Sequence, residues 1–393
     1  MRICTRYISA TVLAALLALA ASALGPAVAG AGAGSGGGDT VRIGLEAPLS
    51  GDQATIGKGM LNGARLAAKQ LNARQGIGGK QVEIVAIDDA ADPATGVDAA
   101  KAAIAKGLAG VVGPYNSGVG AETLPLYIEA GLVPIRLTSA DATAGLGFTL
   151  QPMTSQIAPV ASGALTDWLK ATSVAIAYDP TALYTESVSA TLKQLLEQAG
   201  VTITAFEPVQ PGAKSYTDVV QKLAATKPDV IYAATYFPEG GLIAKAVRAL
   251  DRPPKCVADY GSYDTGFITV AGVKAARSCP VVGVPSPNEF VGSKRFVAAY
   301  RKQFHSAPGT WSPYAFDSVN ALAAAAEKAG GFDAAKLTDV LNQVSGSKGW
   351  TGSITLEAGS GNREPATVVL LATTLRGTFR VDPSWVKAVG AGG

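Results

Sequence analysis

The sequence contains one histidine, three cysteines and almost no excess of charge. His305 lies in the basic and aromatic segment YRKQFH, which is typical of a helix end, and one imidazole is a poor basis for a metal site. The sequence also lacks a G-x-S-x-G elbow, a His-x-x-x-His pair and a cysteine in a catalytic motif. The adjacent carboxylates of Asp88 and Asp89 are interpreted as strand-end and loop residues. These absences argue against an enzyme and against a metal or other cofactor.

The small charge excess argues against a nucleic-acid partner. The 33 basic and 30 acidic residues give a net charge of +3, and without Arg2 and Arg6 the count is 31 against 30. Proteins that bind a nucleic-acid duplex carry clustered excess positive charge. A small-molecule ligand therefore fits this composition better than a polyanion.

Long hydrophobic runs are also missing after the first residues. Arg2 and Arg6 precede an apolar run at 11–24, and Ala27-Val28-Ala29 has the A-x-A form of a signal peptidase site. The run is shorter than the roughly 20 residues of a membrane-spanning helix. Cys4 precedes the apolar run, whereas a lipidated cysteine would follow it. We therefore expect a signal peptide at 1–29, a Gly/Ala-rich leader at 30–39, and a protein exported to the periplasm or the medium that is neither membrane-spanning nor a lipoprotein.

Export bears on the two remaining cysteines. Cys256 and Cys279 are left after the signal peptide is removed, and an exported protein with two thiols most often oxidises them to one disulfide. The alternative is a pair of buried free thiols. The sequence favours the disulfide.

The rest of the chain alternates between strand-like and helix-like segments. Apolar residues recur at helical spacing from Met60 through Ala64 to Leu71, and Asp92 followed by Pro93 is a typical helix start. Short apolar or β-branched runs predict buried parallel strands at 82–88, 110–113, 133–137, 174–178, 201–207, 230–235 and 280–284. This order predicts doubly wound α/β sheets, and 393 residues are enough for two domains.

Seven motifs in order give the chain a family resemblance. They are PLSG near the start, LNARQGIGG followed by VEIVAIDDAADP, GVVGPYNSGV, VP-x4-SA at 133–140, YDPTALY, ATYFPEGG, and the segment from Gly261 to Gly272. In these motifs the chain resembles the type I periplasmic solute-binding proteins of ABC importers, and among them the leucine/isoleucine/valine-binding group. The resemblance runs from about Thr40 to the C-terminus. It implies two Rossmann-like lobes joined by three hinge crossovers, with lobe 1 at 40–155 plus 288–362 and lobe 2 at 156–287 plus 363–393.

The resemblance also implies ligand-binding residues in lobe 1. Ser117 follows a strand and a Gly-Pro turn in GPYNSG, where its hydroxyl and N–H would meet a ligand carboxylate at a helix start. The alternative for Ser117 is a simple helix N-cap. Ser139 and Asp141 match two family positions that hold the amino and carboxyl groups. Asp141 departs from the usual threonine, and its carboxylate would either pair with a ligand cation or cap the following helix.

The resemblance implies that three tyrosines of lobe 2 face the ligand-binding residues of lobe 1. Tyr184, Tyr236 and Tyr260 are expected to face the same cleft, each with an apolar ring and one hydroxyl. Tyr260 stands where amino-acid binders of the family carry an acidic residue for the ligand ammonium. If Asp259 or Asp141 replaces that acid, the ligand is an α-amino acid. If neither does, an amine-free carboxylate or amide fits better, because a buried ammonium without a partner is costly.

These patterns together predict the substrate-binding protein of an ABC importer. We expect a monomer that closes its two lobes around a branched-chain or other apolar amino acid and is recognised by a membrane permease. The alternatives are a binder of an amine-free carboxylate or amide, such as an aromatic acid, a ligand-sensing receptor domain, and a structural surface protein.

Overall fold

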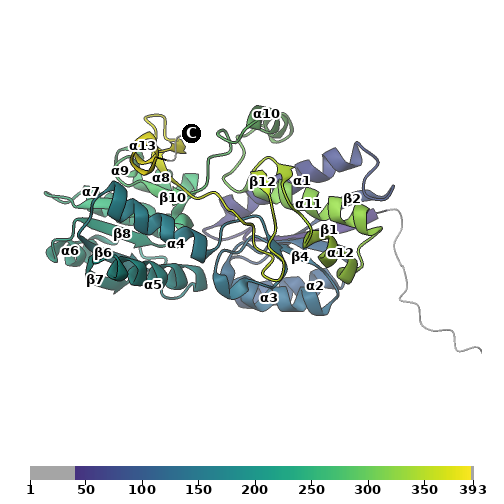
Figure 1. Cartoon of the computed structure of the whole chain (residues 1–393), viewed down its shortest axis with the longest axis horizontal. Coiled ribbons are helices and arrows are strands. Elements are labelled where there is room, and N and C mark those ends of the chain that lie inside the picture. The colour runs from purple at the N-terminus through teal and green to yellow at the C-terminus, as the bar shows by residue number, and fades with distance from the viewer. Residues whose placement is uncertain (1–39, 391–393) are drawn as a thin grey trace, which may run out of the picture. The chain divides into compact units, whose positions relative to one another are not determined.

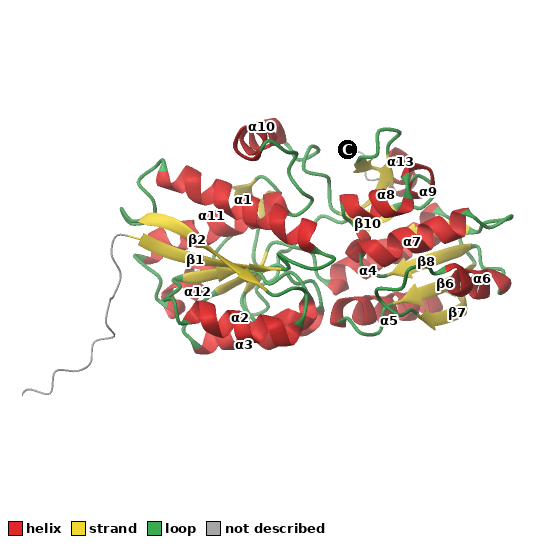
Figure 2. Ribbon diagram, turned by 180° about the vertical axis from the view of Figure 1, so that it is seen from behind, coloured by secondary structure: helices red, strands yellow, loops and turns green. Residues whose placement is uncertain are grey.

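The computed structural model describes residues 40–390, and the predicted signal peptide, the leader and Cys4 lie outside that range. Its strands form two main sheets, each flanked by helices (Figure 1). One helix group contacts the first sheet: α1 (Ala54–Asn72), α2 (Pro93–Ile104), α3 (Ser117–Glu129) and α11 (Ser312–Ala329), with α10 (Ser293–Phe304) and α12 (Ala334–Leu341) packed on α1 and α11. Figure 2 shows the first sheet between α1 and α11 on one face and α2 and α3 on the other.

The first sheet has five parallel strands in the order β2-β1-β3-β4-β5. Its strands are β1 (Thr40–Ala47), β2 (Gln81–Asp88), β3 (Gly110–Val112), β4 (Pro134–Arg136) and β5 (Phe148–Thr149). Every residue of β3 and β4 is buried, as expected for strands covered on both faces.

The second sheet repeats this order and adds two strands. The parallel strands run β7-β6-β8-β9-β10, and β13 and β14 extend the β10 edge in antiparallel pairing. Its strands are β6 (Ser173–Tyr178), β7 (Thr202–Pro208), β8 (Val230–Ala234), β9 (Lys255–Ala258), β10 (Val281–Gly283), β13 (Val369–Thr373) and β14 (Phe379–Val381). Its helices are α4 (Thr154–Gly163) with its continuation η2 (Ala164–Trp168), α5 (Leu183–Gln198), α6 (Thr217–Ala225), α7 (Phe237–Arg248), α8 (Thr265–Ala271), α9 (Val273–Ala276) and α13 (Pro383–Val389).

The chain passes three times between the two groups: between β5 and α4, between β10 and α10, and between β12 and β13. The short hairpin of β11 (Ser347–Gly349) and β12 (Gly352–Ile354) precedes the third passage. The doubly wound α/β prediction is confirmed, with two lobes and three crossovers. The exact residue bounds of the lobes stay a prediction.

Two of the predicted strands differ from expectation in burial. β2 and β7 contain mostly exposed or half-buried residues, whereas the sequence predicted buried strands. Both lie at a sheet edge, where one side of the strand has no neighbour. The helix start at Asp92 is confirmed, because its carboxylate accepts a hydrogen bond from the N–H of Thr95 at 2.8 Å. His305 is the exposed residue that ends α10.

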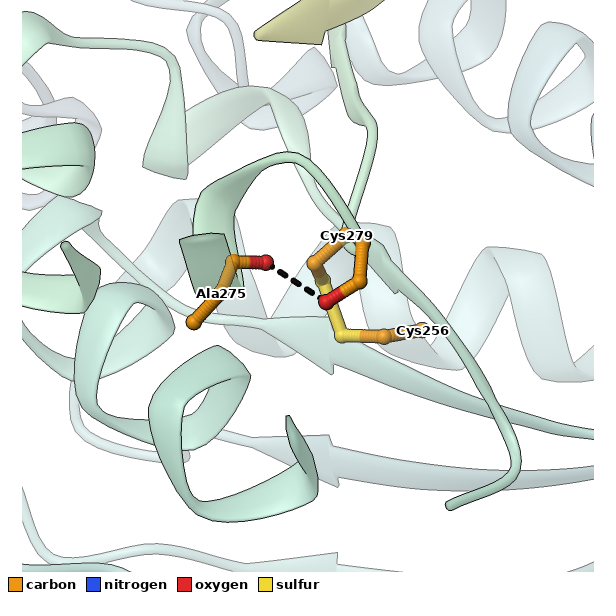
Figure 3. Close-up of a disulfide and its surroundings, with 4 residues drawn as sticks. Cys256, Ala275 and Cys279 are labelled. Carbon is orange, nitrogen blue, oxygen red and sulfur yellow. Dashed lines mark hydrogen bonds between the residues drawn. A yellow bond between two sulfur atoms is a disulfide. The ribbon is translucent and has the colours of Figure 1, made fainter. Parts of the chain in front are cut away.

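The predicted disulfide is present. Cys256 in β9 is bonded to Cys279, which lies between α9 and β10 (Figure 3). Both residues are buried, at 3% and 0% exposure. The bond ties the end of the α8–α9 segment to the centre of the second sheet.

Removing this bond is expected to lower the free energy of unfolding by about 3 kcal/mol, because the unfolded chain regains the entropy of the closed loop. The two cysteines are 23 residues apart. Urea denaturation with and without reductant measures the loss. The double variant Cys256→Ala, Cys279→Ala is the control, since reductant should no longer change its stability. Equal stability of the oxidised and reduced protein would contradict the prediction.

The first lobe also buries two carboxylates side by side. Glu46 in β1 and Asp89 after β2 are both 0% exposed. Burial raises the pKa of both groups, that of Asp89 to about 7, and the charge of Asp89 further raises the pKa of Glu46. Thr123 donates a hydrogen bond to Glu46 at 3.1 Å, and the N–H of Ala91 donates one to Asp89 at 2.8 Å.

A raised pKa in the folded state makes the protein less stable as pH rises. Asp89 ionises near pH 4 when unfolded and near pH 7 when folded, so stability should fall between these values, by on the order of 2–4 kcal/mol. Asp89→Asn removes this ionisation and keeps an acceptor for Ala91. Urea denaturation at pH 5 and pH 8 should therefore show a smaller pH effect for the variant than for the wild type. An identical pH effect in both proteins would rule out Asp89 as its source.

The described part of the chain offers neither a membrane span nor a metal cluster. Between residues 40 and 390 no helix is long and apolar enough to cross a bilayer. The same residues contain no group of three His, Cys, Asp or Glu side chains placed to hold a metal ion.

Candidate functional site

The strand order of each sheet places a crevice at the carboxyl ends of its first and third strands, so each lobe has a crevice at the same point of its sheet. In a 2-1-3-4-5 sheet, helices leave the first and third strands toward opposite faces, and ligands bind beyond the carboxyl ends of those strands. The third strand of the first sheet, β3, is followed by Gly113 to Asn116 and then α3. The third strand of the second sheet, β8, is followed by Thr235 and Tyr236 and then α7. The predicted residues Ser117 and Tyr236 therefore lie at the starts of the two corresponding helices, Ser117 as the first residue of α3 and Tyr236 immediately before α7.

A small cavity lies where these segments meet. It is lined by Tyr115, Ser117, Leu137, Ser139, Tyr184, Tyr236, Tyr260 and Gly261. Five of the seven predicted ligand-binding residues are in this list, and Asp141 and Asp259 are not. The cavity volume is about 10 Å³, room for roughly one water molecule. A larger ligand therefore needs the walls to move apart before it enters. A larger hollow between α11, α12 and β11 contains none of the predicted residues.

Ser117 is the first residue of α3 and is 2% exposed. Its Oγ accepts hydrogen bonds from the N–H of Ser139 at 3.3 Å and of Ala140 at 3.1 Å, so its own proton is free to be donated. The N-cap is Asn116, not Ser117, and Asn116 makes no side-chain capping bond. The first N–H groups of α3 thus have no acceptor among residues 40–390. This arrangement suits a carboxylate at the helix start.

Gln151 links the two lobes and was not predicted from the sequence. It lies in the first crossover and is 0% exposed. Its Oε1 accepts hydrogen bonds from Ser139 Oγ at 3.3 Å and from Tyr260 Oη at 3.2 Å. Its Nε2 has no hydrogen-bond partner among the described residues. No local sequence signal marks Gln151, because its partners lie 12 and 109 residues away.

Asp259 lies behind the cavity wall. It is 0% exposed, and its carboxylate accepts hydrogen bonds from Tyr184 Oη at 2.8 Å, Tyr232 Oη at 2.5 Å and the N–H of Gly261 at 3.2 Å. Burial raises the pKa of Asp259, whereas the bonds from Tyr232 and Tyr184 lower it. Asp259 therefore fixes the orientation of Tyr184 in this structure.

Asp141 lies apart from the cavity. It is exposed, and its carboxylate accepts hydrogen bonds from the N–H and hydroxyl of Ser155 in α4, at 3.3 and 3.0 Å. This geometry corresponds to the helix-capping alternative for Asp141, with α4 as the capped helix.

Aromatic side chains supply four of the eight residues that line the cavity. The four tyrosines that line the cavity form a closed circuit with Trp311, which packs behind them. We call these five residues the aromatic cage, in the order Tyr115, Tyr236, Tyr184, Tyr260 and Trp311. Tyr115 and Trp311 were not among the residues predicted from the sequence. Tyr115 lies inside the GPYNSGV motif, so that motif could have identified it. Trp311 lies at the start of α11, far from any of the seven motifs in the sequence. Burial raises the pKa of the four tyrosines, so their hydroxyls stay protonated.

Comparison with known proteins places the chain among the periplasmic binding proteins. A family model described as "Periplasmic binding protein" matches residues 40–372. The chain is 31% identical to the Leu/Ile/Val-binding protein BraC3 of Rhizobium johnstonii, over 74% of this chain and 80% of the relative.

Solved structures share the fold. The substrate-binding protein LivJ of Streptococcus pneumoniae in complex with isoleucine has a TM-score of 0.79 and 24% identity, covering 86% of this chain and 97% of LivJ. A solute-binding protein of an ABC transporter from Rhodopseudomonas palustris, in complex with 3,4-dihydroxybenzoic acid, has a TM-score of 0.76 and 21% identity, covering 88% of this chain and 96% of that protein.

Proposed function

Because this chain belongs to the periplasmic binding protein family, we propose that it is the exported substrate-binding subunit of an ABC importer and that it captures a branched-chain or other apolar amino acid. The family is one of binding proteins and not of enzymes. The observation that carries the proposal is the cavity between the two lobes, with Ser117 at a helix start on one side and three tyrosines on the other.

Binding is proposed to stabilise the closed arrangement of the lobes. A ligand shifts such an equilibrium only by its different affinity for the two states. Contacts to Ser117 from lobe 1 and to Tyr184 or Tyr236 from lobe 2 are available together only when the lobes are closed. The closed form would then be the one that a membrane permease recognises.

One observation favours the second ligand class. No acidic side chain lines the cavity, since Asp259 is engaged by three donors and Asp141 is exposed. A primary ammonium placed there would lack a carboxylate partner. An amine-free carboxylate, such as the aromatic acid bound by the Rhodopseudomonas relative, is therefore the alternative ligand.

A thermal-shift screen of the exported protein tests the function. The ligands are the amino acids, aliphatic and aromatic carboxylates, and the corresponding amides. A ligand at 100 times its dissociation constant adds about 2.7 kcal/mol of stability, which raises the melting temperature measurably. A shift with leucine, isoleucine or valine supports the main proposal, and a shift only with amine-free acids supports the alternative. No shift with any small carboxylate or amide would contradict both.

Ser117→Ala is expected to weaken binding of the carboxylate ligand about ten- to hundredfold, because the hydroxyl donor is lost, and such bonds to a charged group contribute about 1.5–3 kcal/mol. Isothermal titration measures the affinity. Ser155→Ala is a matched control that removes a hydroxyl outside the cavity. Unchanged affinity in Ser117→Ala, with the fold intact by circular dichroism, would contradict the carboxylate assignment.

A further inference from the structure

The aromatic cage is a closed circuit of five rings. Successive centroids are 6.3 Å apart for Tyr115 and Tyr236, 6.4 Å for Tyr236 and Tyr184, and 6.1 Å for Tyr184 and Tyr260. Trp311 closes it, at 5.1 Å from Tyr260 and 5.9 Å from Tyr115. The planes of successive rings are inclined to one another by 43–59°.

Both lobes contribute to the cage. Tyr115 and Trp311 precede α3 and α11, which pack on the first sheet, whereas Tyr184, Tyr236 and Tyr260 belong to the second lobe. All five side chains are at most 9% exposed. The circuit is therefore complete only when the lobes are together, and a group held at its centre contacts both of them.

The size of the circuit suits a cation. A regular pentagon with edges of this length has its centre about 5 Å from each corner, within the roughly 6 Å over which a ring face attracts a cation. Tyrosine and tryptophan faces are electron-rich, and Trp is the strongest of the aromatic residues in this interaction.

The surroundings favour positive charge at that centre. Asp259 lies behind the wall, and its carboxyl group accepts a hydrogen bond from the hydroxyl of Tyr184 at 2.8 Å, which increases the electron density of that ring. The cavity lining contains no Lys, Arg or His side chain to oppose a cation. It contains no carboxylate either, so the three N–H groups of a primary ammonium would find few acceptors. A quaternary ammonium has no N–H group and needs only the ring faces.

We propose that the aromatic cage binds a quaternary ammonium group and that the ligand class is a small carboxylate whose nitrogen is fully methylated. The ligand carboxylate lies at Ser117 and the start of α3, and the methylated nitrogen lies within the cage. This inference rests on the proposed function as a substrate-binding subunit. It narrows the ligand from apolar amino acids to their N-methylated forms.

A pair of equal-shaped probes tests the inference. Glycine betaine and 3,3-dimethylbutanoate have the same shape and the same carboxylate, and differ in a positively charged nitrogen against a neutral carbon. Isothermal titration of the exported protein should give at least tenfold tighter binding for glycine betaine. Equal or tighter binding of 3,3-dimethylbutanoate would overturn the inference in favour of an amine-free acid.

Leucine separates this inference from the proposed function. Tighter binding of leucine than of glycine betaine would overturn the inference and leave the importer function standing. If none of the three probes binds and the wider screen is also negative, both the inference and the proposed function fail.

Variants of Tyr236 locate the effect in the cage. Tyr236→Phe keeps the ring and should change glycine betaine affinity less than threefold, whereas Tyr236→Leu removes the ring and should weaken it at least tenfold. The affinity ratio of glycine betaine to 3,3-dimethylbutanoate is measured in each variant, so that general damage to the site cancels. A ratio unchanged in Tyr236→Leu would overturn the assignment of the charged group to the cage.

Discussion

Replacing Asp259 with alanine is expected to lower the free energy of unfolding by about 3 kcal/mol or more. The substitution leaves the hydroxyls of Tyr184 and Tyr232 buried without an acceptor, and each such group costs about 1–3 kcal/mol. Ligand affinity should also fall, because Tyr184 loses the partner that fixes its orientation. Urea denaturation and isothermal titration measure the two effects.

Two other variants make this prediction specific. Asp259→Asn retains one acceptor oxygen and should have an intermediate effect on stability. Asp141→Ala removes an exposed carboxylate that accepts hydrogen bonds from Ser155 outside the cavity, so it should cost about 1 kcal/mol and leave ligand affinity unchanged. Loss of binding in Asp141→Ala, with Asp259→Ala binding normally, would reverse the roles assigned to the two acids.

Gly113→Ala is expected to cost about 3–5 kcal/mol and to weaken ligand binding more than tenfold. Gly113 has a φ of +102°, and a Cβ at this position would overlap the carbonyl oxygen of Glu46 in the neighbouring strand β1. Relief of that overlap requires the loop after β3 to move, and the loop carries Tyr115 and Ser117 into the cavity. Thermal denaturation and ligand titration measure the change.

A second glycine in the same segment provides the control. Gly118 is the second residue of α3, and a Cβ there would make an ordinary van der Waals contact with Cγ of Pro93, at 3.8 Å. Gly118→Ala should therefore be neutral or stabilising by up to about 1 kcal/mol. A loss of stability in Gly118→Ala equal to that in Gly113→Ala would show that the loop responds to any added side chain.

The secondary structure was predictable because its signals are local. An apolar run of four to seven residues indicates a strand. Asp92 before Pro93 starts a helix because its carboxylate accepts a hydrogen bond from the N–H of Thr95, only three residues later. Burial of β2 and β7 was not predictable, because the position of a strand within its sheet depends on pairing between distant segments.

The candidate site was predictable in part. Ser117 and Tyr236 follow strands whose ends meet at the crevice, so their approach follows from sheet order. Asp259 is adjacent in sequence to Tyr260, yet only Tyr260 lines the cavity, because Tyr184 and Tyr232 hold the carboxylate on the other side of the wall. Nothing near Gln151 or Trp311 in the sequence indicates their place in the site.

The sequence by itself determined the doubly wound lobes and the disulfide partners, because these depend on periodicity and on the number of cysteines. Its seven ordered motifs indicated the family, and the resemblance implied the five predicted residues that line the cavity. Only the tertiary structure decided which acids face the cavity, which residue bridges the lobes, and how five aromatic rings close into one circuit. Those features depend on side chains brought together from distant segments, and no local pattern encodes such contacts. Gln151 with Tyr260 and Tyr115 with Trp311, for example, are more than 100 residues apart.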